Sequence, residues 1–341
     1  MSTENIDVEG FAGRLGFHLV SVIPYAPLKA QKPHLDKWLA NGYAGDLEYM
    51  HKGVEKRTDP DLLLPGVQSV ICLAMNYFQP FPPAPQGAHA KVARYAWGKD
   101  YHSVIEKKLK KIRNYIIEES AKANSSASGA SRNSSISGES HNSSASSKLS
   151  KTDFKLCSDA GPILERAYAV KAGFGFIGKN GMLITKQYGS WVFLAEILVR
   201  AKLKYSQVPK IQGAHCGSCT RCLDACPAKA IIKPRVINAE KCLSYQTIEN
   251  KKNSPPPNIR KNLNGWIFGC DMCQEVCPHN FGSKITDIPE FLNHRAGPYL
   301  NMQEIAEMTE KQFAEKFAGS PLKRAGLKKL KDTANYVNIR T

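Results

Sequence analysis

The sequence contains the run Cys216-Gly-Ser-Cys219-Thr-Arg-Cys222-Leu-Asp-Ala-Cys226-Pro227. Its spacing, C-x2-C-x2-C-x3-C-P, is the bacterial pattern for binding [4Fe–4S] clusters. Three closely spaced thiolates can surround one cluster, while the fourth, followed by a proline that ends the local turn, points toward a second cluster. The run therefore predicts a region that holds two clusters and transfers single electrons.

A second, looser group of cysteines supplies the remaining ligands. Together the two groups contain eight of the ten cysteines of the chain, and Cys277 is again followed by proline. In the crossed arrangement of bacterial ferredoxins, the fourth cysteine of a run ligates the other cluster. We therefore expect two ligand sets: Cys216, Cys219, Cys222 and Cys277 for cluster 1, and Cys226, Cys242, Cys270 and Cys273 for cluster 2.

Structural zinc and disulfides are the alternative uses of these cysteines. Zinc sites commonly pair two C-x2-C units and need neither the three-cysteine run nor the repeated Cys-Pro ending. Disulfides need an oxidising compartment, whereas no apolar signal segment opens this sequence and no run of about 18 apolar residues could span a membrane. We therefore expect [4Fe–4S] clusters in a cytoplasmic protein.

Length and composition predict a soluble chain of about two domains. The 341 residues are 42% hydrophobic and carry a formal net charge of +17. This charge is unusual for a simple electron carrier and suggests a polyanionic partner, although a solvated basic surface would give the same value. We expect a catalytic domain over residues 1–205, a ferredoxin-like domain over 206–285 and a basic helical segment over 286–341.

Alternating helix and strand patterns predict an α/β or α+β fold for the first domain. Strands are expected near residues 19–23 and 69–75, and Cys72 lies inside the second, where a buried and inert thiol is expected. From residue 124 to 148 the composition is almost entirely Ser, Asn, Ala and Gly. Such a segment cannot bury enough apolar surface to offset its ordering entropy, so we expect a disordered insertion.

Asp159 follows an expected strand at residues 154–158 and precedes a helix that begins near Pro162. A rigid frame often holds catalytic groups at such junctions. The competing interpretation is a helix N-cap, because an aspartate there accepts unpaired backbone N–H groups.

The glycine-rich stretch at residues 173–180 matches G-x-G-x-x-G and nearly matches the phosphate-binding loop. Both motifs require a preceding strand and a following helix. Here a helix is expected before the stretch and a strand after it, so we reject both nucleotide-binding interpretations. The glycines are expected to end the helix and to permit a close backbone approach.

With these residues in view, nearly the whole chain outside the insertion resembles the epoxyqueuosine reductases. The resemblance rests on six sets of motifs: Arg57-Thr-Asp-Pro60 with Leu64-Pro-Gly66, Ala93-Arg-Tyr95 with Asp100-Tyr-His102, Ser158-Asp-Ala-Gly-Pro-Ile-Leu-Glu-Arg-Ala167, Ala172-Gly-Phe-Gly-Phe-Ile-Gly-Lys-Asn180, Cys242-Leu-Ser-Tyr-Gln-Thr-Ile-Glu249, and Phe268-Gly-Cys-Asp-Met-Cys-Gln-Glu-Val-Cys-Pro-His-Asn280. Together these motifs are far more specific than the cysteine run alone.

The resemblance implies a cobalamin-binding α/β (α+β) domain, related to that of reductive dehalogenases, before the ferredoxin-like domain. It implies reduction of epoxyqueuosine at the wobble position (34) of tRNA to queuosine, the last step of queuosine biosynthesis, with cob(II)alamin and two [4Fe–4S] clusters. The electrons would come from an external donor of the flavodoxin or ferredoxin type. We expect no membrane partner and a monomer.

The same resemblance assigns roles to individual residues. Asp159 is implied as the proton donor, and we expect burial beside a macrocycle to raise its pKa. Arg57, Asp159, Asn180 and Ser244 are implied as cobalamin contacts, with the glycines of residues 173–178 making room for the corrin. For tRNA, the expected phosphate contacts are Arg260, Lys261, Lys323, Arg324, Lys328 and Lys329, and the expected base-stacking residues are Trp266 or His279.

Two rival functions remain at this point. One is another cytoplasmic corrinoid iron–sulfur reductase that acts on a small molecule, although such enzymes usually carry an export signal and would not require a charge of +17. The other is a basic ferredoxin-like electron carrier without a substrate. If the protein were only an electron carrier, the roughly 200 residues before the cysteines would have no function, although a domain of that size usually has one.

Overall fold

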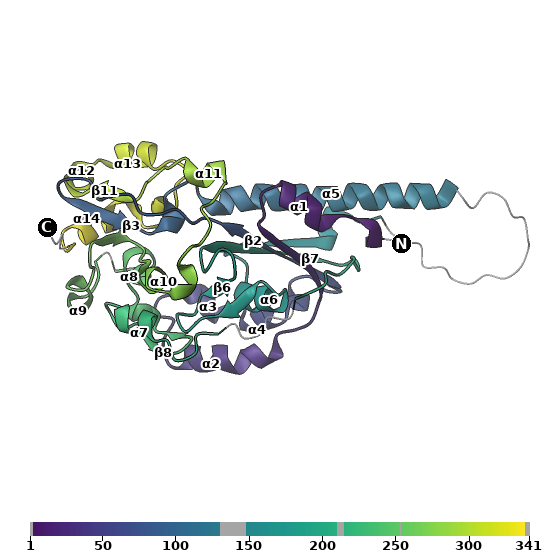
Figure 1. The fold of residues 1–341 in the computed structure, drawn as a ribbon, viewed down its shortest axis with the longest axis horizontal. Coiled ribbons are helices and arrows are strands. Elements are labelled where there is room, and N and C mark those ends of the chain that lie inside the picture. Colours follow the sequence, from purple (N-terminus) through teal and green to yellow (C-terminus); the bar gives the residue numbers. More distant parts are fainter. Residues whose placement is uncertain (1–2, 130–147, 210–214, 253, 338–341) are drawn as a thin grey trace, which may run out of the picture.

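A four-stranded antiparallel sheet forms the centre of the N-terminal part of the chain (Figure 1). The structure is a computed structural model that describes residues 3–129, 148–209, 215–252 and 254–337. The strands lie in the order β1 (Leu19–Pro24), β2 (Ser69–Asn76), β7 (Val192–Val199) and β4 (Phe154–Cys157). All three pairings are antiparallel, so the fold class is α+β.

Helices cover both faces of this sheet, which explains why every residue of β2 is buried. On one face lie α1 (Val8–Arg14) and the long helix α5 (Tyr101–Gly129), whose apolar residues at helical spacing pack against alternate residues of β2. On the other face lies α6 (Glu165–Lys171), which packs against the remaining residues of β2. A strand buried on both sides reads as a continuous apolar run rather than as an alternating one.

Short elements surround the face that α6 covers. They are α2 (Lys32–Ala40), α3 (Glu48–His51), α4 (Val54–Thr58) and the hairpin of β5 (Gly175–Ile177) with β6 (Leu183–Thr185). The described chain also contains single turns of 3₁₀ helix: η1 (Thr3–Asn5), η2 (Lys29–Gln31), η3 (Pro60–Leu62), η4 (Arg94–Ala96), η5 (Lys151–Asp153), η6 (Ala239–Lys241), η7 (Pro278–Asn280) and η8 (Pro321–Arg324).

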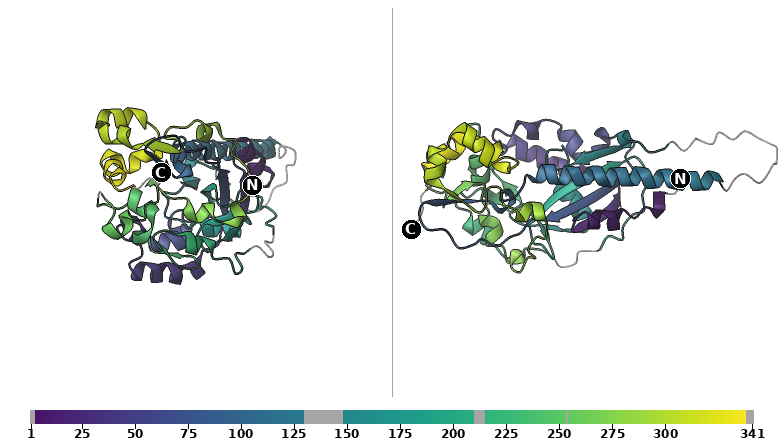
Figure 2. Two further views of the ribbon diagram at one scale, coloured as in Figure 1. Left: turned by 60° about the vertical axis from the view of Figure 1, so that its left-hand side comes forward. Right: turned by 90° about the horizontal axis from the view of Figure 1, so that it is seen from above.

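A second sheet joins one strand from each of the three expected segments. Its strands are β10 (Trp266–Phe268), β3 (His89–Val92) and β11 (Tyr299–Asn301), with β3 parallel to β10 and antiparallel to β11. A second apolar core packs around it, and helices from the C-terminal segment bury side chains there. The expected segments are therefore interlocked in space, as the two further views show (Figure 2).

The remaining helices and strands belong to the cysteine-rich and C-terminal segments. They are α7 (Arg221–Ala225), β8 (Ile231–Lys233), β9 (Val236–Ile237), α8 (Leu243–Ile248), α9 (Pro257–Arg260), α10 (Met272–Glu275), α11 (Pro289–Leu292), α12 (Met302–Glu307), α13 (Glu310–Lys316) and α14 (Gly326–Ala334). In the described part of the chain, no helix combines the length and apolarity needed to cross a membrane.

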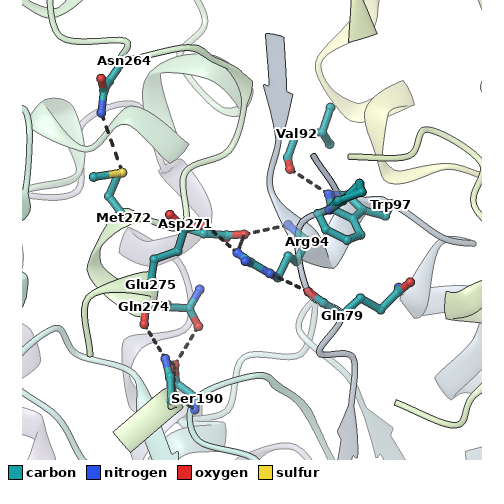
Figure 3. Close-up of polar contacts among 12 residues, drawn as sticks. Gln79, Val92, Arg94, Trp97, Ser190, Asn264, Asp271, Met272, Gln274 and Glu275 are labelled. Atoms are coloured by element: carbon teal, nitrogen blue, oxygen red, sulfur yellow. Dashed lines mark hydrogen bonds and ion pairs between the residues drawn. The ribbon is translucent and has the colours of Figure 1, made fainter. Parts of the chain in front are cut away.

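A buried arginine ties the first part of the chain to α10 (Figure 3). The Arg94 guanidinium donates to Asp271 Oδ2 at 3.1 Å and to Glu275 Oε1 at 2.8 Å, and the Arg94 backbone N–H donates to the same Asp271 oxygen at 2.9 Å. The rings of Phe81 and Trp191 lie 4.3 and 4.7 Å from the guanidinium carbon. This contact fixes α10, and with it two of the cysteines, against the N-terminal part.

One expected boundary needs correction. Helix α5 continues to Gly129, so the first residues of the expected disordered insertion are helical rather than disordered. Residues 130–147 of that insertion lie outside the described residues.

Candidate active site

A cavity of about 510 Å³, open to solvent, lies where the N-terminal part meets α8 and η8. Its lining includes Tyr49, Tyr95, Tyr101, His102, Asp159, Ser244, Glu249 and Arg324. With Tyr245, four tyrosine rings line the cavity. These rings and an open side fit a large ligand with planar parts, such as a corrin. The cavity is therefore the candidate active site.

Asp159 lies in the turn between β4 and α6, and its side chain reaches this cavity. Its Oδ2 accepts hydrogen bonds from the Tyr101 hydroxyl at 2.5 Å and, in the matching tautomer, from His102 Nε2 at 3.1 Å. The N-cap of α6 is Leu164, which makes no side-chain cap. The helix-cap interpretation of Asp159 is therefore wrong.

The His102 imidazole lies between two carboxylates, those of Asp100 and Asp159. His102 Nδ1 lies 2.9 Å from Asp100 Oδ1, while Nε2 faces Asp159. Burial alone would lower the pKa of His102, but hydrogen bonds with Asp100 and Asp159 and the charges of both carboxylates outweigh it and raise the pKa to about 9. At neutral pH His102 is therefore an imidazolium.

The pKa of Asp159 moves opposite to the sequence-based expectation. Burial raises it, but hydrogen bonds from His102 and Tyr101, with the positive charges of His102 and Arg324, more than offset burial and lower the pKa. The expectation considered burial alone and is wrong for this structure. Asp159 is an ionised partner of His102, so the proton of the site resides on the imidazole.

Of the other three expected cobalamin contacts, one lines the cavity and two do not. Ser244 lies on α8 and lines the cavity with Asp159. Arg57 lies behind the lining residue Tyr49: its Nη2 donates to the Tyr49 carbonyl at 2.8 Å, while its buried Nε has no partner among the described residues. Asn180 lies farther off and donates to the Cys273 carbonyl at 3.2 Å.

The cysteines expected for cluster 1 surround one small cavity. Its lining contains Cys216, Cys219, Cys222 and Cys277 together with Lys179. The Lys179 backbone N–H donates to Cys216 Sγ at 3.3 Å, and its ammonium donates to the carbonyls of Gly217 and Cys219 at 2.8 and 2.9 Å. A sulfur-lined cavity with an N–H···S hydrogen bond fits an iron–sulfur cluster.

The cysteines expected for cluster 2 also lie together. Burial raises the pKa of the Cys273 thiol, and the nearby charges of Cys242 and Cys226 raise it further. Burial likewise raises the pKa of Cys270, as do the charges of Cys273 and Cys242. Cys226 Sγ accepts the Ala230 N–H at 3.2 Å.

The cluster 2 set is connected directly to the active-site cavity. Cys242 is the N-cap residue of α8, whose first turn contributes Ser244 and Tyr245 to the cavity wall; its C-cap residue, Glu249, also lines the cavity. Burial raises the pKa of Cys242, while the backbone N–H groups of Tyr245 and Ser244 lower it by hydrogen bonding to the sulfur. One short element therefore borders both the sulfur ligands and the candidate active site.

The glycine-rich stretch forms the β5–β6 hairpin. A Cβ on Gly175 would lie 1.9 Å from the Ile184 carbonyl oxygen, and one on Gly178 would lie 2.5 Å from the Ile184 side chain. Both glycines therefore permit a close approach of the neighbouring strand. The expected helix before the stretch is confirmed as α6, and the expected strand after it as β6.

Two expected tRNA contacts are wrong. Trp266 is fully buried in the second core and cannot stack on a base. Lys329 is buried on α14 and donates to the Asn250 backbone carbonyl. By contrast, Lys323 and Arg324 lie at the rim of the cavity, and Arg324 Nε pairs with Glu249 Oε1 at 2.6 Å.

Sequence reasoning missed the two residues that hold the Asp159 carboxylate. Tyr101 and His102 belong to the motif Asp100-Tyr-His102, which was noted only as part of the family resemblance. A tyrosine next to a histidine at the start of a helix was the available signal. The pairing itself joins residues 57 positions apart and is a product of the tertiary fold.

Two family models match the chain. The model described as "Epoxyqueuosine reductase QueG, DUF1730" matches residues 57–128. The model described as "4Fe-4S double cluster binding domain" matches residues 215–280, which include all eight cysteines of the two expected sets.

Relatives and solved structures match over most of the chain. The epoxyqueuosine reductase of Atelocyanobacterium thalassa is 38% identical over 317 residues, 92% of this chain and 92% of the relative. That of Synechocystis sp. is 37% identical over 291 residues, covering 85% and 89%. A crystal structure of epoxyqueuosine reductase with a tRNA-Tyr epoxyqueuosine-modified stem loop matches with a TM-score of 0.79 and 28% identity, covering 97% of this chain and 80% of that chain. The structure from Streptococcus thermophilus gives 0.76 and 29%, with the same coverage.

Proposed function

Because the chain belongs to the epoxyqueuosine reductase family, an oxidoreductase family, we propose that it reduces epoxyqueuosine at the wobble position of tRNA to queuosine with cob(II)alamin and two [4Fe–4S] clusters. The observation that carries this proposal is the cavity itself. It brings a hydrogen-bonded acid–imidazole pair to within one short helix of a cysteine set.

The chemistry of the proposed reaction determines what the protein must supply. Converting the epoxide to an alkene takes up two electrons and two protons and releases one water. Opening a C–O bond leaves an alkoxide, which needs a proton as it forms. Cobalamin, when bound in the cavity, would supply the reducing chemistry at the substrate carbon, so the protein has to position the substrate and deliver protons.

The pair of His102 and Asp159 is suited to deliver the first proton. In our proposal Asp159 Oδ2 is the donor atom, and it takes the proton from His102 Nε2 across their 3.1 Å contact. After transfer His102 is neutral and the substrate oxygen is a hydroxyl. Asp100, on the other imidazole nitrogen, holds the ring in this orientation. The Tyr101 hydroxyl donates to the same carboxylate oxygen and steadies it.

The four expected cobalamin contacts enter the proposal with different roles. Asp159 and Ser244 would contact the cofactor directly, because both line the cavity. Arg57 would act by supporting Tyr49, and Asn180 by supporting the Cys273 backbone. The cluster ligands would be the two expected sets, with cluster 2 nearer to the cavity through Cys242.

The basic charge supports tRNA as the partner. A dense polyanion favours a protein with a net charge of +17, and the resulting affinity should fall steeply as salt rises. Lys323 and Arg324 at the cavity rim would contact phosphates near the modified base. The solved relative with an epoxyqueuosine-modified stem loop supports this choice of partner.

The test is conversion of epoxyqueuosine-tRNA by the anaerobically purified protein with cobalamin and a one-electron reductant. We expect queuosine-tRNA from the wild type and from the control Asp36→Ala, which changes a half-exposed surface aspartate. We expect no product from Asp159→Ala, with the visible and EPR signals of both clusters retained. Absence of corrinoid binding, or normal turnover by Asp159→Ala, would overturn the corresponding part of the proposal.

A further inference from the structure

The acid loop, residues 158–164, holds Asp159 in an unusual backbone conformation. Its φ is +54°, in the left-handed region that residues with a side chain seldom occupy. Aspartate tolerates this region better than most residues, but the conformation still costs free energy. A contact from outside the loop must therefore favour it over more extended alternatives.

Glu165, the first residue of α6, makes such a contact. Its Oε1 accepts the Asp159 backbone N–H at 2.5 Å. The neighbouring backbone bonds, from Ala160 N–H to the Ser158 carbonyl and from Ile163 N–H to the Gly161 carbonyl, stay within the loop itself. Among the described residues, Glu165 is thus the side chain that connects the Asp159 backbone to a helix.

Of two neighbouring carboxyls, Glu165 and Glu196, Glu165 is the one that more readily carries the negative charge. Beneath it, Glu196 lies on β7 between Cys72 and Cys157 of the neighbouring strands, and both of its buried carboxyl oxygens lack a partner among the described residues. Two nearby buried carboxyls cannot both ionise readily, and burial, with the charge of Glu165, raises the pKa of Glu196 well above its usual value. Glu196 is therefore the protonated member.

Nearby positive charges make Glu165, rather than Glu196, the carboxyl that carries the negative charge. Arg166 on α6, His102 on α5 and Arg57 on α4 all interact favourably with it. Against them, burial first and then the charge of Asp159 raise its pKa to about 7. The fully enclosed Glu196 has no such cationic neighbours among the groups that influence it.

We propose that Glu165 is a positioning residue for the proton donor: its carboxylate fixes the backbone of Asp159 so that the Asp159 side chain reaches Tyr101 and His102 together. This inference rests on the proposed function for its kinetic consequence, but its structural part concerns the loop alone. Without the acceptor, the loop would relax toward ordinary φ values and the carboxylate would leave one or both partners.

The experiment compares Glu165→Ala, Glu165→Gln and a matched control, Glu310→Ala. Glu310 also opens a seven-residue helix, α13, but is exposed, so its removal reproduces the loss of a charge at a helix start. The readouts are kcat and KM for epoxyqueuosine-tRNA and the hydrogen exchange rate of the Asp159 amide.

We expect Glu165→Ala to lower kcat about tenfold to a hundredfold, the range set by losing one hydrogen bond to a charged group, with KM unchanged. Its Asp159 amide should exchange at least about tenfold faster, because the amide loses its acceptor. Glu165→Gln retains a carbonyl oxygen and should recover most of both properties. Glu310→Ala should match the wild type.

Two results would overturn the inference: unchanged Asp159 exchange in Glu165→Ala, or a Glu165→Gln variant as impaired as Glu165→Ala, which would assign the effect to charge rather than to the hydrogen bond. If the wild type itself failed to convert epoxyqueuosine-tRNA, the proposed function would fall. The exchange measurement would still decide whether Glu165 holds the loop.

Discussion

Replacing Arg94 with methionine should strongly destabilise the junction between the N-terminal part and α10. The side chain is 8% exposed and its two carboxylate partners, Asp271 and Glu275, are 3% and 29% exposed. Methionine fills similar volume but leaves the Asp271 carboxylate buried without its cation. The Gln79 carbonyl, which accepts from Arg94 Nε at 2.8 Å, also loses its donor.

The magnitude follows from the cost of leaving a buried charge unpaired. Removing one partner of a buried ion pair typically costs about 3–5 kcal/mol of unfolding free energy. We expect the lower part of this range, because burial raises the pKa of Asp271 to about 6 and the carboxyl can take up a proton when its cation is lost. The double variant Arg94→Met/Asp271→Asn should regain part of the loss, with a coupling energy of about 2 kcal/mol.

Urea denaturation followed by tryptophan fluorescence measures this directly. Trp191 and Trp97 lie 4.7 and 5.7 Å from the Arg94 guanidinium carbon, so they report on this junction. The control is Arg14→Met, which removes an exposed arginine whose pair with Asp7 spans 3.9 Å. It should cost less than about 1 kcal/mol.

Iron content provides a second readout. Helix α10 contains Cys273 and directly follows Cys270, so a loosened junction should release iron from the cluster 2 set first. The reasoning would be refuted if Arg94→Met and Arg14→Met unfolded at the same urea concentration, or if the double variant showed no coupling.

Two further predictions concern the clusters and the proton site. Cys277→Ser should damage the cluster of Cys216, Cys219 and Cys222, as judged by EPR; selective loss of the other cluster would contradict the crossed assignment. Because the pKa of His102 is raised from 6.5 to about 9, its ion pair with Asp159 should contribute fully below pH 6.5 and disappear as pH rises through about 9. The kcat profile should therefore fall above about pH 9, and His102→Gln should lack that limb; an unchanged limb in His102→Gln would exclude His102 as its source.

Local spacing explains what the sequence could predict. The spacing of four cysteines within twelve residues was enough to predict which of them would lie together. The structure groups Cys277 with the first three cysteines of that run. The apolar run at residues 69–75 likewise predicted β2, because a strand buried on both faces needs no alternation. The position of Asp159 at a strand end was also visible from its neighbours.

Properties that depend on residues distant in the sequence could not be predicted from local spacing. The direction of the Asp159 pKa shift is set by His102 and Tyr101, which come from another helix. Glu196 stands out as a single charge within an apolar strand, but only the fold reveals that it lacks a partner. The basic pattern of the C-terminal segment, similarly, did not distinguish the buried Lys329 from the exposed Lys328.

The sheet of β10, β3 and β11 has a consequence for how the protein is made. Strand β3 emerges early from the ribosome but cannot complete its pairing until β11, near the end of the chain, has been synthesised. The second core, which packs around this sheet, can therefore close only late in synthesis. Truncations that remove β11 should yield a product that folds poorly rather than a shorter working enzyme.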